Sequence, residues 1–171
     1  MNNEKLRIKC KSLFICFCLF SIFCFGQKSK FLNIGYDRIG QNNFIKVGYK
    51  IALTDIEEFE RNFSTFSGDL AYTSIDNKSC YSPSLTYNFY GLFYYTGISV
   101  HYFTRNNEHD FRIAPQIGFT YFNVLNLGYS FYLPLNNENE IKNIGRHSFN
   151  ISISIPIELL SKTNIFKNQK K

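Results

Sequence analysis

Residues 147–157 read HSFNISISIPI, and this stretch decides the fold class. Large apolar residues alternate there with small polar ones. The apolar set is Phe149, Ile151, Ile153, Ile155 and Ile157, and the polar set is Ser148, Asn150, Ser152 and Ser154. Successive side chains of a β-strand point to opposite faces of the sheet. A period of two therefore predicts a strand with one apolar face and one polar face.

The same alternation recurs along most of the chain, in the stretches 31–38, 43–54, 68–76, 82–90, 93–104, 111–122 and 123–134. It is weakest over 68–76, where Leu70 and Tyr72 compete with Ala71 and Ile75 for the buried face. Helical spacing occurs only over 55–66, which we expect to be a connection with one helical turn. Eight strands of about ten residues suit tilted membrane-crossing strands better than the ~5–6 residues of soluble sheets. The sequence thus predicts an all-β, antiparallel, up-and-down transmembrane β-barrel of about eight strands.

The composition of the polar face favours a membrane barrel over a soluble one. Serine, asparagine, glycine and glutamine fill it, and five glycines lie on it: Gly35, Gly48, Gly97, Gly118 and Gly128. Small residues suit the narrow interior of an eight-stranded barrel. Tyrosines on the apolar face suit a membrane–water boundary. The alternative is a secreted soluble β-barrel or sandwich that hides its apolar face and binds a small apolar ligand.

The first 26 residues are predicted to be a cleaved secretory signal peptide. Basic residues (Lys5, Arg7, Lys9 and Lys11) precede an apolar run over 13–25, and Gly26 supplies a small residue before Gln27. The alternatives are a lipoprotein signal at Cys24 and a membrane anchor, for which about 20 Å of helix is too short. Cleavage would leave Cys80 as the one cysteine, which excludes an internal disulfide and a cysteine metal site.

The net charge of +6 is unevenly distributed. Residues 1–26 and residues 158–171 each contribute +3, and residues 27–157 hold as many basic as acidic groups. We therefore predict a neutral barrel domain over 27–157 and a basic, disordered tail over 158–171. The basic pI gives no support for a nucleic-acid surface, which needs basic groups clustered on the folded body.

Two runs carry a resemblance to a known class of proteins. Residues 111–118, FRIAPQIG, and residues 127–134, LGYSFYLP, together with the predicted signal peptide and the alternating strands, resemble small outer-membrane β-barrel proteins of Gram-negative bacteria. The resemblance covers most of residues 30–157. It implies an outer-membrane location and contact with outer-membrane lipid. Such barrels often finish on a terminal aromatic residue, whereas a 14-residue tail follows the last strand here.

The sequence shows no phosphate-binding loop, metal-ligand spacing or nucleophile motif, so we expect no catalytic, cofactor-binding or metal-binding residues. The three histidines, His101, His109 and His147, are far apart, and His109 and His147 are expected in or beside loops. Some barrels of the resembled class modify lipids with a rim histidine and serine. His101 with Ser99 and His147 with Ser148 are the candidate pairs for this alternative, although adjacent strand residues such as the second pair point to opposite faces.

Polar residues on the inward face are expected to form an interior network, whose members are Asp37, Lys46, Lys50, His101, Arg112 and Gln116. Buried charges need partners, so we interpret this set as a plug, with an anion-attracting narrow pore as the alternative. The polar connections 105–110 and 135–146 are expected on the cell surface, where they could meet an extracellular partner. We therefore expect a non-catalytic outer-membrane barrel with a structural or surface-interaction role.

Overall fold

The computed structural model describes residues 29–53, 62–122, 124–135, 141 and 143–158. Its strands are β1 (Lys30–Ile39), β2 (Asn42–Ala52), β3 (Phe63–Ile75), β4 (Lys78–Tyr90), β5 (Tyr94–Arg105), β6 (Glu108–Tyr121), β7 (Leu125–Phe131), β8 (Leu133–Pro134) and β9 (His147–Pro156). No helix in these ranges is both long and apolar enough to cross a membrane. The predicted signal peptide and all but the first residue of the predicted tail lie outside the described residues.

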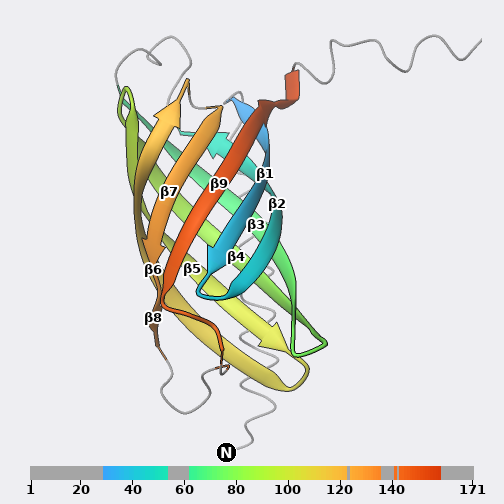
Figure 1. Ribbon diagram of the computed structural model, residues 1–171. Coiled ribbons are helices and arrows are strands. Elements are labelled where there is room, and N and C mark those ends of the chain that lie inside the picture. Colours follow the sequence, from blue (N-terminus) through green and yellow to red (C-terminus); the bar gives the residue numbers. More distant parts are fainter. Residues whose placement is uncertain (1–28, 54–61, 123, 136–140, 142, 159–171) are drawn as a thin grey trace, which may run out of the picture.

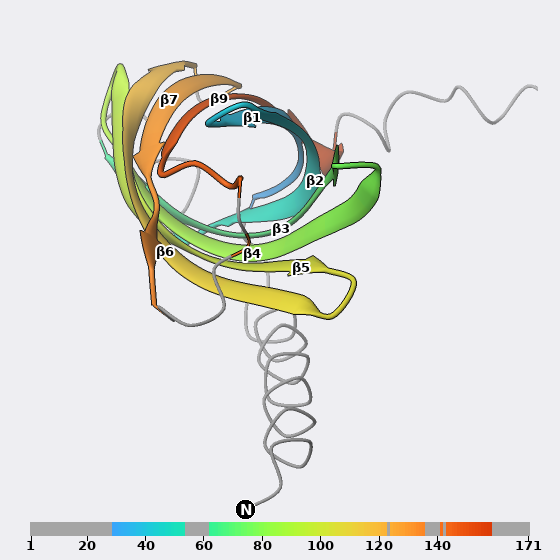
Figure 2. The same cartoon turned by 60° about the horizontal axis from the view of Figure 1, so that its bottom comes forward.

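The strands close into one antiparallel barrel (Figures 1 and 2). Each of the strands β1 to β6 pairs with the next along the chain, β7 pairs with β9, and β9 pairs with β1. Strands β7 and β8 share one register against β6, so they form a single barrel strand interrupted at Tyr132. The prediction of an all-β, antiparallel, up-and-down barrel with eight strands is confirmed.

The strands are staggered around the barrel. Starting from Lys30, the paired residues on successive strands are Ile51, Phe66, Tyr87, Ile98 and Pro115. The β6–β7 register, continued one residue past Gln116 and Ser130, leads from Pro115 to Phe131, which pairs with His147. His147 leads back to β1 at Gly40, whose amide donates a hydrogen bond to the His147 carbonyl. One full turn around the barrel, from Lys30 to Gly40, therefore shifts the register by 10 residues along β1. A stagger of this size tilts strands by roughly 35–45° and leaves an interior that side chains can fill.

In the seven barrel strands for which the sequence assigned residues to the two faces, the apolar set occupies the outward positions and the polar set the inward ones, although Ile51 of the apolar set is buried. In the ambiguous strand β3, Leu70 and Tyr72 face outward while Ala71 and Ile75 face inward. Several strands begin earlier than predicted: β4 begins at Lys78, β6 begins at Glu108, and Phe63–Phe66 belong to β3 rather than to a connection. These residues gain a full ladder of hydrogen bonds with β4, which outweighs their helical spacing. The rest of that predicted connection, 54–61, lies outside the described residues.

The two ends of the barrel differ in their connections. We call the end where β1 begins and β9 finishes the terminal end, and the opposite end the hairpin end (Figure 1). Two-residue turns join β1 to β2, β3 to β4 and β5 to β6 at the hairpin end. The predicted loop 105–110 is therefore wrong: Arg105 closes β5, Glu108 opens β6, and the two strands stay paired up to the turn. Asn106, in the left-handed conformation, makes so short a turn feasible.

Candidate functional site

The barrel interior has three layers. The terminal end holds a buried cluster made of Phe31, Ala52, Phe63, Tyr90 and Tyr95. The rings of Phe63 and Tyr90 stack there, with their centroids 4.8 Å apart. At the hairpin end a larger cluster consists of Ile39, Phe44, Ala71, Ile75, Cys80, Phe103, Ala114, Tyr132, Ile141 and Ile144. Polar side chains fill the layer between them. Both ends of the interior are thus closed by packed side chains.

An ion pair helps to hold the hairpin-end cluster together. Arg112, 2% exposed, donates from Nε (2.8 Å) and Nη2 (2.6 Å) to Oδ2 of Asp110. Its Nη1 donates to the carbonyls of Ile144 (3.2 Å) and Gly145 (2.9 Å). The Ile141 amide also donates to Asp110 Oδ2, at 3.4 Å. The pair therefore fixes the described part of the connection between β8 and β9 against the barrel interior.

A second set of charges lies in the polar layer. Lys46 Nζ donates to both carboxylate oxygens of Asp37 at 3.1 Å. Lys50 Nζ donates to the hydroxyls of Tyr90 (3.0 Å) and Ser154 (2.6 Å). Every one of these side chains comes from the inward face of a strand, so the alternation of the sequence places them together.

Asp69 is the third interior carboxylate, and its oxygens are held by neutral donors. Asn33 Nδ2 donates to its Oδ1 at 2.8 Å, and the Ser67 hydroxyl donates to its Oδ2 at 3.0 Å. Away from the rim, the described part of the interior therefore carries three acidic side chains (Asp37, Asp69 and Asp110) and three basic ones (Lys46, Lys50 and Arg112), which balance. Arg105, buried at the hairpin-end rim, is paired with Glu108 and Asp76. An interior without an excess of positive charge favours a plug over an anion-attracting pore.

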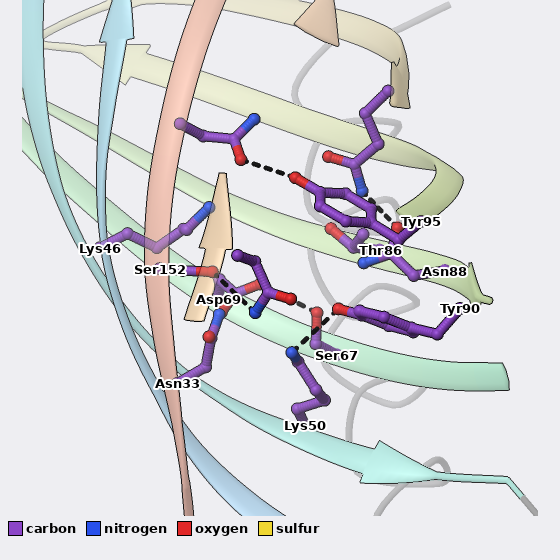
Figure 3. A pocket seen from close by; sticks show the side chains of 13 residues that line it. Asn33, Lys46, Lys50, Ser67, Asp69, Thr86, Asn88, Tyr90, Tyr95 and Ser152 are labelled. Carbon is purple, nitrogen blue, oxygen red and sulfur yellow. Dashed lines mark hydrogen bonds between the residues drawn. The ribbon is translucent and has the colours of Figure 1, made fainter. Parts of the chain in front are cut away.

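Neutral hydrogen bonds connect the remaining strands across the interior. Tyr95 donates to Asn150 (2.9 Å), Asn150 to Ser130 (3.2 Å), Ser130 to Gln116 (3.4 Å), and Gln116 to Asn88 (2.5 Å). Tyr95, Asn150, Gln116 and Asn88 of this chain line a polar cavity of about 30 Å³, and Figure 3 shows Tyr95 and Asn88 among the side chains around it. A water molecule needs roughly 10–15 Å³ measured in this way, so the cavity suits a few waters rather than an apolar ligand.

The inward glycines make room for this network. A Cβ atom on Gly48 would overlap Oδ1 of Asp69, and one on Gly128 would overlap the hydroxyl of Tyr95. The structure thus gives a physical reason for glycine on the polar face: large polar side chains from neighbouring strands cross over these positions.

The structure places all six members of the predicted interior network inside the barrel. It brings Asp37 and Lys46 into contact, and it places Lys50 and Gln116 beside the cavity. Arg112 lies away from them, within the hairpin-end cluster, and His101 lies beside that cluster with its ring stacked on Phe103.

Neither predicted histidine–serine pair comes together on the outer rim. His101 Nε2 lies 2.9 Å from the Ser99 hydroxyl, but both side chains are buried inside the barrel. His147 faces outward beside Tyr129 while Ser148 faces inward, as strand geometry requires. His109, expected in or beside a loop, lies in β6 and accepts or donates a 2.8 Å hydrogen bond with Tyr102.

Sequence reasoning missed two interior carboxylates, Asp69 and Asp110. Asp69 lies in the stretch with the least regular alternation, and Asp110 lies in the predicted loop 105–110. Extending the period of two backward from Arg112 would have placed Asp110 on the same inward face, two residues away.

The outer surface is apolar and layered. Among the described strand residues, the outward-facing Asp, Glu, Lys and Arg residues are Lys30 and Arg38, each within one residue of an end of β1. Outward aromatic residues lie toward the hairpin end at Tyr36, Tyr72, Tyr81, Tyr102, Phe111, Tyr129, Phe131 and Phe149, and toward the terminal end at Tyr49, Phe66, Tyr87, Phe89, Tyr94, Phe119 and Tyr121. Between them lie aliphatic residues, including Ile34, Val47, Leu70, Leu85, Ile98, Val100, Ile113, Leu127 and Ile151.

The described residues contain no group of three or more His, Cys, Asp or Glu side chains that could hold a metal ion. Comparison of the chain with protein-family models, with curated proteins and with solved structures gave no match. Function therefore has to be argued from the geometry of the barrel itself.

Proposed function

We propose that the protein is an integral outer-membrane β-barrel of a Gram-negative bacterium, exported by residues 1–26, with a structural or surface-interaction role and no catalytic activity. The observation that carries the proposal is the outward face, where an aliphatic zone without charged residues lies between two sets of aromatic residues. Aromatic girdles on both sides of an apolar band are typical of outer-membrane barrels.

The barrel interior also favours this function over the two alternatives, a soluble barrel that binds an apolar ligand and an enzyme with its active site on the outer rim. A soluble barrel that binds an apolar ligand needs an apolar cavity, whereas the cavity here is small and polar. A rim enzyme needs catalytic groups that reach lipid, whereas His101 and Ser99 are enclosed. Two connections were expected to meet an extracellular partner. Residues 105–110 form a tight hairpin with little exposed loop, so a surface role would fall mainly to the connection 135–146.

A single tryptophan tests the proposal, because the chain has none of its own. Ile98 lies on the outward face near the middle of β5. We expect Ile98→Trp, reconstituted in phosphatidylcholine vesicles, to be quenched by brominated acyl chains and shielded from aqueous acrylamide. Gln41→Trp, in the exposed β1–β2 turn, is the water-exposed control. Strong acrylamide quenching of Ile98→Trp without bromine quenching would contradict the proposal.

A further inference from the structure

The connections at the terminal end differ sharply in charge. The connection between β2 and β3 contains Asp55, Glu57, Glu58, Glu60 and Arg61 in its sequence. The turns at 91–93 and 122–124 contain no charged residue, and they belong to charge-free runs that extend over 79–104 and 113–137. One side of this end is therefore polar in sequence, whereas the side formed by β4 to β7 is not.

The two charge-free turns lie next to each other. The Thr120 amide donates to the Phe93 carbonyl at 3.0 Å, and Tyr94 pairs with Phe119 across β5 and β6. Together they form an exposed surface that we call the apolar turn patch, consisting of Leu92, Phe93, Tyr94, Phe119, Tyr121 and Phe122. Leu92 is 63% exposed, Phe93 64% and Phe122 76%. The patch continues the apolar outward face beyond the strand ends.

Phe122 is an unexpected residue for its turn. Its φ of 48° is left-handed, a conformation that glycine or asparagine adopts more easily than a bulky residue does. Its ring packs edge-on against Tyr121, with ring centroids 4.6 Å apart, and Phe122 is 76% exposed. Among the described residues, a phenylalanine here gains little packing, which fits a contact with something outside the chain.

We propose that the apolar turn patch is immersed in the lipid leaflet at the terminal end, so that the barrel lies tilted with its β4–β7 side inserted more deeply. This inference rests on the proposed function. Lipid fits the patch better than a second copy of the chain does, because protein interfaces carry a polar rim and several hydrogen bonds. In the six patch side chains the only polar groups are the Tyr94 and Tyr121 hydroxyls, which suit a membrane interface.

The topology sets the direction of the tilt. In the ring of eight barrel strands, β5 lies diametrically opposite β1. Lys30 opens β1 with an exposed charged side chain, which keeps that side of the terminal end at the water boundary. The lipid boundary therefore crosses the terminal end obliquely, beyond the turns on the β5 side and at the strand end on the β1 side.

Single-tryptophan variants at the patch test the immersion. The full chain carrying Leu92→Trp or Phe122→Trp is reconstituted in dioleoylphosphatidylcholine vesicles with lipids brominated either near the headgroup or near the chain end. Ile98→Trp is the lipid-exposed reference and Gln41→Trp the water-exposed reference. We expect headgroup-proximal bromines to quench both patch variants as strongly as chain-end bromines quench Ile98→Trp, and acrylamide to quench them far less than Gln41→Trp.

The outcomes separate this inference from the proposed function. If acrylamide quenches both patch variants like Gln41→Trp while Ile98→Trp is quenched by bromine, the patch lies in water and the inference is overturned, but the membrane barrel stands. If neither quencher reaches the patch variants, protein covers the patch, which also overturns the lipid assignment. If Ile98→Trp escapes bromine, both proposals fail. Should Phe122→Trp not fold, Leu92→Trp carries the test.

Discussion

The two ends of this barrel are closed by different chemistry. At the terminal end, stacked aromatic rings fill the interior and two short connections are apolar. At the hairpin end, Arg112 of a buried ion pair with Asp110 binds backbone carbonyls of the last connection. Charged residues lie in or beside the short turns of this end, at Arg38, Asp76, Lys78, Arg105 and Glu108. The two ends show two ways of closing a narrow barrel interior: packed aromatic rings at the terminal end, and packed side chains held by a buried ion pair at the hairpin end. We expect the hairpin end to depend more strongly on single residues, because each partner of an ion pair needs the other.

The largest effect is expected from breaking the ion pair. Asp110→Asn leaves the Arg112 charge buried without its counter-charge, which should lower the free energy of unfolding by about 3–5 kcal/mol. At the terminal end, Tyr95→Phe removes one hydrogen bond to Asn150 and should cost only about 0.5–1.5 kcal/mol. Urea unfolding in lipid vesicles measures both.

A double variant provides the control for that comparison. Replacing Asp110 by Val together with Arg112 by Met removes both charges with little change in volume, so part of the lost stability should return, less the hydrogen bonds of Arg112 to the Ile144 and Gly145 carbonyls. Equal losses for Asp110→Asn and Tyr95→Phe would show that the two ends do not differ in the way described.

The next largest loss of stability is expected from a charge in the outward aliphatic zone, which lies between the two ends of the barrel. Ile98→Arg places a charge in the middle of the outward aliphatic zone, where it should cost about 2–4 kcal/mol in a bilayer. Ser74→Arg, outward-facing and one residue from the hairpin end of β3, should cost about 0–1 kcal/mol. Refolding yield and urea unfolding in vesicles check the pair, and a small cost at Ile98 would argue against lipid around the middle of the barrel.

A smaller effect tests the space that the terminal-end cluster needs. Gly128→Ala would push a Cβ into the Tyr95 hydroxyl, and such overpacking should cost about 1–3 kcal/mol. Gly68→Ala is the matched control, because that position faces outward and its nearest neighbour would be Leu85 Cδ2 at 3.7 Å. Thermal unfolding in detergent should show a clear loss for the first variant and none for the second; similar behaviour of both would remove the proposed role of the inward glycines.

The smallest effect is expected at the rim of the hairpin end. Arg105 contacts Glu108 at 2.6 Å and Asp76 at 3.3 Å, but both carboxylates are more than half exposed. Glu108→Gln should therefore change the free energy of unfolding by less than about 1 kcal/mol, and less still at high salt. A loss as large as that of Asp110→Asn would mean that charge at the rim stabilises this end as much as the buried pair.

The sequence predicted the barrel and the facing of its strands because alternation is a local property, readable from neighbouring residues. Thus Lys46 and Arg112 could be assigned to the interior before any partner was known. The alternation could not predict which inward residues form ion pairs. Arg112 pairs with Asp110 of the same strand, whereas Lys46 of β2 pairs with Asp37 of the neighbouring strand β1. Those choices depend on the stagger of the strands, which the pattern does not contain.

The two plugs were also beyond sequence reasoning. Tyr90, Tyr95 and Phe103 are aromatic residues on the polar face, and the rule of apolar residues outward gives no reason for them. They point inward because the ends of a narrow barrel must exclude water by packing. Likewise Ile141 and Ile144 belong to a polar connection, and they are buried because they join the hairpin-end cluster inside the barrel.

Localisation tests the central claim most directly. The full chain, with its first 26 residues, should be expressed in a Gram-negative host, fractionated, and run on a denaturing gel with and without boiling. We predict that it sediments with the outer membrane and that boiling changes its mobility, because a closed barrel resists detergent until heated. Recovery in a soluble fraction, with the same mobility before and after boiling, would contradict the account.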